Sequence, residues 1–179
     1  MSQISCFILV GGKASRFGND KTALFYRLLY RRCQTLFPRV WLVAKGKKYR
    51  NYPFFIEKSS QYAPIFPILE LLKYFPTIFI LSGDTPFISP LQLGRLKKAR
   101  RVAYRNPLVG VYLRRRDWHR LRRRLQTDFR LQQVAPTAPV PEGELININT
   151  PLQWEKWRKR LPPYYQLIAK LKWNGGCKR

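Results

Sequence analysis

The stretch ILVGGKASRFGNDK, residues 8–21, decides the fold and suggests a function. An apolar segment runs directly into the pair Gly11-Gly12, and Arg16 and Lys21 follow before a helical pattern begins. Because glycine has no Cβ, backbone N–H groups there can approach a phosphate closely, while arginine and lysine supply positive charge. The stretch therefore favours a phosphate-binding loop between a strand and a helix, with an ordinary glycine turn as the alternative.

Two common phosphate-binding loops are excluded by spacing. A P-loop requires G-x-x-x-x-G-K-[S/T], but here Lys13 is followed by Ala14, and Phe7 stands where the first glycine belongs. The dinucleotide pattern G-x-G-x-x-G also fails, because the three glycines of the stretch have other intervals.

Length and composition indicate one globular domain. The 179 residues are 45% hydrophobic and 15% aromatic, which argues against disorder. No apolar run approaches the ~20 residues that span a bilayer, and the N-terminus does not resemble a secretory leader. We therefore expect a cytoplasmic protein with no membrane association.

The charge is strongly positive, with 35 basic residues, nine acidic residues and a net charge of +26. Such a balance suggests polyanionic partners, such as a nucleotide, nucleic acid or an anionic surface. The basic residues are dispersed, however, and solvated helix faces explain most of them. We expect nucleic acid to bind only non-specifically.

Strand and helix patterns alternate along the chain, which is typical of an α/β domain with a mostly parallel sheet. Strands are predicted over Ser5–Val10, Val40–Ala44, Phe54–Glu57, Thr77–Ser82, Val102–Tyr104, Leu108–Tyr112 and Leu145–Ile148. Helices are predicted over Thr22–Leu36, Pro67–Phe75, Pro90–Arg101, Trp118–Leu125 and Pro151–Leu161. The proline-rich segment 127–143 is expected to be irregular, and Cys6 and Cys33 are expected to be core residues rather than reactive thiols.

Asp84 is the best candidate for a metal ligand. It lies just past the apolar strand 77–82, at the edge where open α/β sheets bind ligands. A carboxylate there can hold Mg²⁺ against triphosphate oxygens, although an Asp-Thr-Pro turn is the alternative explanation. Glu57 faces the same edge and could lie near the ligand, although a carboxylate at a strand end is more often solvated. Asp20 is treated as structural.

The segment NINTP, residues 147–151, is a third candidate element. In a strand, Asn147 and Asn149 would share a face, from which their amides could ligate Mg²⁺ or bind a polar substrate. The alternative is a helix N-cap formed by Asn149 or Thr150 just before Pro151.

Three motifs together resemble the molybdenum cofactor guanylyltransferases of the MobA type. They are LVGG…RFG…K in residues 9–21, SGDTP in residues 82–86 and NINTP in residues 147–151. The segment 56–64 also looks like the family's connection into its second helix. The likeness covers roughly residues 3–161.

The resemblance implies a single Rossmann-like, three-layer nucleotidyltransferase domain over residues 1–161, with a tail over 162–179 outside it. It implies transfer of GMP from GTP to the molybdopterin cofactor with Mg²⁺, and molybdoenzymes or cofactor-delivery proteins as recipients. The implied roles fall on matching positions: nucleotide contacts from Leu9, Val10, Gly11, Gly12, Lys21 and Asp84; catalytic charge from Arg16, Lys21 and Asp84; Mg²⁺ on Asp84; and pterin contacts from Asn147 and Asn149.

Two positions depart from the family pattern. Lys58 stands where members often have an aspartate, and Val43 stands where some have an asparagine. Base selectivity therefore stays open between GTP and the CTP-using pterin or sugar-phosphate branches. A basic nucleic-acid-binding module is the alternative from another class, although no recognised nucleic-acid motif accompanies the charge.

Overall fold

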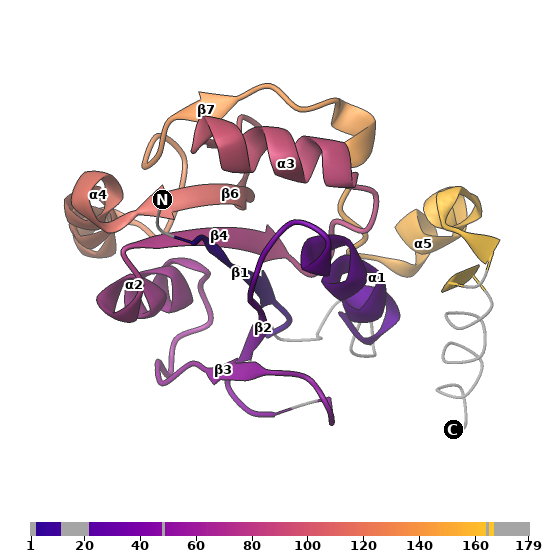
Figure 1. The fold of residues 1–179 in the computed structure, drawn as a ribbon, viewed down its shortest axis with the longest axis horizontal. Coiled ribbons are helices and arrows are strands. Elements are labelled where there is room, and N and C mark those ends of the chain that lie inside the picture. The colour runs from indigo at the N-terminus through magenta and orange to yellow at the C-terminus, as the bar shows by residue number, and fades with distance from the viewer. Residues whose placement is uncertain (1–2, 12–21, 48, 164, 167–179) are drawn as a thin grey trace.

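The computed structural model describes residues 3–11, 22–47, 49–163 and 165–166. Within these residues, seven strands form one mixed, mostly parallel sheet in the order β3-β2-β1-β4-β6-β5-β7 (Figure 1). The strands are β1 (Ser5–Leu9), β2 (Val40–Ala44), β3 (Phe54–Ile56), β4 (Thr77–Ser82), β5 (Val102–Ala103), β6 (Asn106–Leu113) and β7 (Thr137–Ala138). Strands β1 to β4 are mutually parallel, and β6 runs antiparallel to β4. The predicted α/β architecture is confirmed.

Helices cover both faces of the sheet and make it the middle of three layers (Figure 1). They are α1 (Thr22–Gln34), α2 (Ile65–Tyr74), α3 (Pro90–Ala99), α4 (Arg114–Thr127) and α5 (Pro151–Trp157). One apolar core joins α1, α3 and α5 to the sheet, and a second core joins α2 and α4 to the opposite face. Cys6 and Cys33 are buried in the first core, as expected, and burial raises the pKa of the Cys6 thiol.

Strand β4 is buried at every residue because β1 and β6 flank it and helices cover both of its faces. Its side chains alternate between the two cores: Phe79 belongs to one, and Ile78 and Ile80 belong to the other. Since β1 to β4 are parallel, their carboxyl ends meet at one edge. This shared edge positions the candidate site.

The prediction of a strand over Leu145–Ile148 is wrong. These residues form no strand, and a short 3₁₀ turn over Glu142–Glu144 precedes them. The N–H of Ile148 donates to the carbonyl of Asp84 at 2.9 Å instead of joining a neighbouring strand. The segment is therefore held against the turn that follows β4.

The expectation that segment 127–143 is entirely irregular is also wrong, because Thr137–Ala138 forms β7 beside β5. Helix α4 begins at Arg114, four residues earlier than predicted. The buried Asp117 carboxylate accepts the N–H of Leu113 at 2.8 Å and so closes the first turn of this helix.

Two residues near the end of the described chain belong to the core that contains α5. Leu161 and Tyr165 are both buried there, on either side of the predicted boundary between the domain and the tail. Among the helices that the structure describes, none has the length and apolar composition needed to cross a bilayer.

Candidate active site

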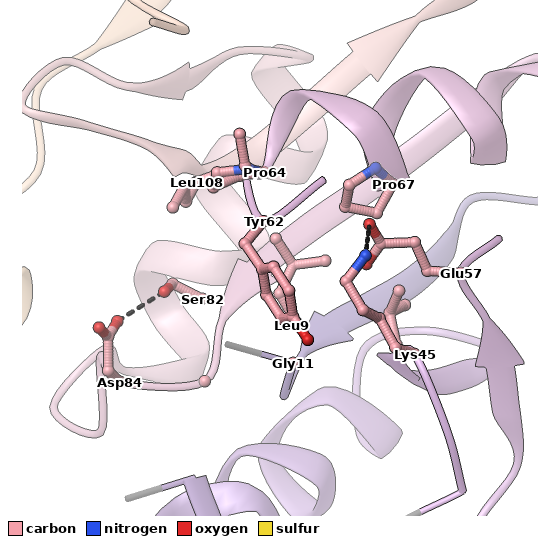
Figure 2. A pocket seen from close by; sticks show the side chains of 13 residues that line it. Leu9, Gly11, Lys45, Glu57, Tyr62, Pro64, Pro67, Ser82, Asp84 and Leu108 are labelled. Atoms are coloured by element: carbon pink, nitrogen blue, oxygen red, sulfur yellow. Dashed lines mark hydrogen bonds and ion pairs between the residues drawn. The ribbon is translucent and has the colours of Figure 1, made fainter. Parts of the chain in front are cut away.

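A cavity of about 240 Å³ opens at the carboxyl ends of the parallel strands (Figure 2). It lies where the strand order reverses between β1 and β4, which is the usual ligand position in open α/β sheets. The residues that line it come from the strand ends and from the start of α2. They are Leu9 at the end of β1 and Gly11 just after it; Val43 of β2 and Lys45 just after it; Glu57 after β3; Ser82, Gly83 and Asp84 at the end of β4; Leu108 of β6; and Tyr62, Ala63, Pro64 and Pro67 at the start of α2.

The end of β1 is tied to both neighbouring strands. Gly11 N–H donates to the Val43 carbonyl at 3.1 Å, and Gly83 N–H donates to the Leu9 carbonyl at 3.0 Å. A Cβ on Gly11 would lie 3.2 Å from the Cα of Ala44, so glycine allows β1 to pass this close to β2. The glycine therefore serves strand packing here as well as any contact with a ligand.

Leu9, Gly11 and Asp84 are brought together at this cavity, as the sequence predicts. The Val10 side chain is instead fully buried in the core, so only its backbone can serve the expected nucleotide contact. Gly12, Arg16 and Lys21 lie outside the described residues, as does Asp20.

Asp84 belongs to a hydrogen-bonded turn and lines the cavity at the same time. Its Oδ1 accepts the hydroxyl of Ser82 at 2.5 Å, and the buried hydroxyl of Thr85 donates to the Ser82 carbonyl at 2.7 Å. The turn and the ligand-binding interpretations are thus compatible. One oriented carboxylate beside a cavity suits Mg²⁺, which commonly takes one or two carboxylates and completes its shell with phosphates and water.

Glu57 is not solvated, contrary to expectation. Its side chain is only 8% exposed, and its Oε1 accepts a hydrogen bond from Lys45 Nζ at 3.3 Å (Figure 2). Burial raises the pKa of Glu57, and the nearby Lys45 ammonium opposes part of that rise. The two side chains follow neighbouring parallel strands, and this pairing was the sequence signal that could have placed Glu57 in the site.

The two departures from the family pattern occupy different places. Val43 lines the cavity with an apolar side chain. Lys58 lines a separate cavity between α2 and α4, and its N–H donates to Glu70 Oε2 at 3.0 Å. Position 58 therefore contributes no side chain to the cavity that contains Asp84.

Asn147 and Asn149 do not share a strand face, since this segment is not a strand. Asn147 Oδ1 accepts from Asn106 Nδ2 at 3.3 Å and lies in a second cavity of about 470 Å³. Thr150 is the N-cap of α5, because its hydroxyl accepts Gln153 N–H at 3.2 Å. Asn149 N–H donates to the Gln153 side chain at 2.7 Å.

A mostly parallel sheet with a cavity at its strand-order reversal, lined by Gly11 and the Asp84 carboxylate, is typical of Rossmann-like α/β proteins that bind nucleotides. Comparison with known families assigns the chain to one family within this class. The chain belongs to the MobA-like NTP transferase domain family, whose family model matches residues 6–135.

The names of curated relatives agree with this family. A molybdenum cofactor guanylyltransferase of Helicobacter pylori strain G27 is 28% identical over 185 residues, with 87% of this chain and 92% of that protein covered. One from Campylobacter jejuni strain 81116 is 26% identical over 133 residues, covering 63% and 70%. The crystal structure of molybdopterin-guanine dinucleotide biosynthesis protein A from Archaeoglobus fulgidus, at 19% identity, shares the fold with a TM-score of 0.70 over 93% of this chain and 99% of that one.

Proposed function

We propose that the chain transfers GMP from GTP to the molybdopterin form of molybdenum cofactor, releases pyrophosphate, and depends on Mg²⁺. Family membership and the names of the relatives support this reaction. The observation that carries the proposal is that Gly11 and Asp84, which follow two neighbouring strands, line one cavity.

The reaction needs little covalent chemistry from the protein. A terminal phosphate oxygen of the cofactor attacks the α-phosphorus of GTP, a new P–O bond forms, and the bond to the β-phosphate breaks. Pyrophosphate leaves with the electron pair, so negative charge grows on the leaving group. Arg16, Lys21 and the N–H groups of the glycine turn are assigned to stabilise that charge.

Asp84 is assigned to hold Mg²⁺, and Ser82 to orient the carboxylate through its hydroxyl. The donor set fits, since Mg²⁺ accepts one protein carboxylate when triphosphate oxygens and water supply the rest. Bound there, Mg²⁺ would reduce the repulsion that a triphosphate presents to an incoming phosphate.

Asn147 and Asn149 are assigned to the pterin cofactor. The hydrogen bond from Ile148 N–H to the Asp84 carbonyl supports this, because it holds the asparagine segment beside the proposed metal ligand. The second cavity, where Asn147 lies, is also lined by Arg160 and Trp157, and the Arg160 guanidinium lies 5.4 Å from the Trp157 ring centroid. An arginine and an indole suit a phosphorylated aromatic ligand.

The same proposal places the reaction in the cytoplasm and makes molybdoenzymes or cofactor-delivery proteins the recipients of the product. Nucleic acid binding is expected to be non-specific and to weaken with salt, because it rests on the net charge of +26.

The test is transfer by purified protein of labelled GMP from α-labelled GTP to molybdopterin cofactor with Mg²⁺, with CTP, ATP and UTP in parallel. Of the four nucleotides, we expect only GTP to give the dinucleotide product and pyrophosphate. In thermal unfolding, GTP at ~100 Kd should stabilise the protein by about 2.7 kcal/mol. Product with CTP instead would assign the chain to the cytidylyl branch, and no product with any nucleotide would refute nucleotidyl transfer.

A further inference from the structure

The polar side chains of the Asp84 cavity gather at two ends. Figure 2 shows Ser82 and Asp84 at one end and the Lys45–Glu57 pair at the other, with Leu9 and Tyr62 between them. On the proposed function, the triphosphate lies at the Asp84 end. The nucleobase then points along the apolar middle of the cavity toward Glu57.

Glu57 is a buried carboxylate that still has capacity to accept hydrogen bonds. Lys45 Nζ reaches its Oε1, and among the residues described no hydrogen bond involves Oε2. An ionised carboxylate only accepts, and its two oxygens offer about four lone-pair directions. A ligand that presents two adjacent donors would therefore match this group.

We propose that Glu57 reads the guanine base by accepting its N1–H and its 2-amino group. Guanine is the one common nucleobase with two neighbouring donors on its pairing edge. Adenine and cytosine place a single amino group beside an acceptor, and uracil places one N–H between two acceptors. A buried carboxylate left facing an acceptor lone pair is strongly disfavoured, so this one group selects against all three.

Lys45 is the positioning residue for Glu57. Its ammonium has three donors, and three acceptors surround it: Glu57 Oε1, the Ser59 carbonyl and the Gln61 carbonyl. The ammonium also lies 4.7 Å from the Tyr62 ring centroid. Lys45 thus fixes the carboxylate and the loop from 57 to 62 without a donor left for the base.

Glu57 replaces a family contact that this chain lacks. Lys58 faces a different cavity, and Val43 has no side-chain hydrogen-bonding group. Within the described lining of the cavity, Glu57 and Asp84 are the only carboxylates, and they lie at opposite ends. In this chain, Glu57 rather than the residue at position 58 would therefore determine which base is bound.

A competing role is hydrogen bonding of Glu57 to the ribose hydroxyls, which acidic residues near strand ends perform in other nucleotide-binding folds. The two roles differ in one measurable respect. A ribose contact is common to every ribonucleotide, whereas a contact with the 2-amino group separates GTP from ITP, which lacks only that group.

The experiment measures binding of GTP, ITP and ATP with Mg²⁺ by calorimetry to the wild type, Glu57→Gln and the control Glu70→Gln. Glu70 holds the same loop through the Lys58 N–H but does not line the cavity. We expect wild type and Glu70→Gln to prefer GTP over ITP by about 10- to 100-fold, which is the effect of one hydrogen bond to a charged group. In Glu57→Gln the preference should fall below about threefold.

Lys45 is tested by the same ratio. Lys45→Met should lower the preference for GTP over ITP, and Lys45→Arg should restore it, whereas a purely structural lysine would change both affinities together. An unchanged ratio in Glu57→Gln, or equal weakening of all three nucleotides, overturns the assignment while GMP transfer by the wild type still supports the proposed function. A wild type that binds no GTP overturns both.

Discussion

Replacing Gly110 with alanine tests how closely the antiparallel half of the sheet is packed. Gly110 lies in β6 opposite Val102 of β5, with a backbone φ of 145°. An added Cβ would lie 2.3 Å from the Cα of Val102 and 2.4 Å from the carbonyl oxygen of Arg101. Both are backbone atoms, so the contact is relieved only if β5 moves away.

Two terms set the size of the effect. A side chain at this φ costs about 1–3 kcal/mol in backbone strain, and overpacking against a neighbour costs about 1–3 kcal/mol more. Their sum, about 2–6 kcal/mol, is large beside the ~5–15 kcal/mol that stabilises a typical domain. Urea unfolding at 25 °C, followed by circular dichroism, measures the loss in the free energy of unfolding.

Gly46→Ala is the matched control. A Cβ on Gly46 would have no heavy atom within 4 Å, and its backbone lies outside the left-handed region. We expect this variant to change the free energy of unfolding by less than about 0.5 kcal/mol. A loss of less than about 1 kcal/mol in the free energy of unfolding of Gly110→Ala would refute this reasoning. It would mean that β5 can be displaced easily although it pairs with both β6 and β7.

Three further outcomes are expected. Asp84→Ala and Lys21→Ala should each lower GMP transfer by about 10²–10³-fold while the circular dichroism spectrum stays that of a folded protein, and near-normal turnover would remove that residue from the mechanism. Asp117→Ala removes a buried carboxylate and leaves the partly exposed Arg116 and the Leu113 N–H without their partner, so it should cost about 1–3 kcal/mol in urea unfolding. Asp128→Ala breaks a pair that is partly exposed on both sides and should cost less than about 1 kcal/mol. Because burial raises the pKa of Glu57 above 4.5, the folded state holds this proton more tightly than the unfolded chain. The stability from Glu57 is therefore lost as pH rises from about 4.5 through the raised pKa, and Glu57→Gln should remove that part of the measured pH dependence.

The sheet was predictable where hydrophobic continuity decides the structure. Strand β4 is a run of mostly apolar residues that both neighbouring strands and both helical layers bury, so its sequence pattern predicts a central strand. The short edge strand β7 was not predictable in this way. Thr137–Ala138 lies between prolines and pairs over two residues only, and its place in the sheet depends on the carbonyls of Pro136 and Ala138 accepting from β5 and the residue after it.

In the segment Leu145–Ile148 the error is the reverse, since a strand is predicted there and the structure has none. Its β-prone composition predicts a strand, yet its backbone is engaged with a loop, through the bond from Ile148 N–H to Asp84. Side-chain pattern reports which residues are buried, not which backbone partner is available. The same limit explains why Asn147 pairs with Asn106 across the second cavity rather than sharing a strand face with Asn149.

Asp84 and Gly11 were predictable because each follows an obvious strand in a parallel sheet. The position of Glu57 at a strand end, taken alone, predicts exposure. The charges at neighbouring strand ends indicate burial instead: β2 ends before Lys45 and β3 ends before Glu57, and strands that pair in register bring these opposite charges together. An acidic residue with such a partner can be buried at lower cost than a solitary one.

Positive charge alone cannot orient a nucleotide on this protein. With 35 basic and nine acidic residues, a triphosphate is attracted to most of the surface. The two carboxylates that line the cavity could instead determine which way a bound nucleotide is oriented. A phosphate within ~4 Å of Glu57 would be opposed by about 4 kcal/mol at an effective dielectric constant of ~20, before the attraction of the Lys45 ammonium is counted. Lys45 has no donor left to hydrogen-bond that phosphate, because its donors already face Glu57 and two loop carbonyls. On the proposed function, the reversed nucleotide would therefore be disfavoured, and the phosphates would lie at the end where Asp84 could share a divalent ion with them.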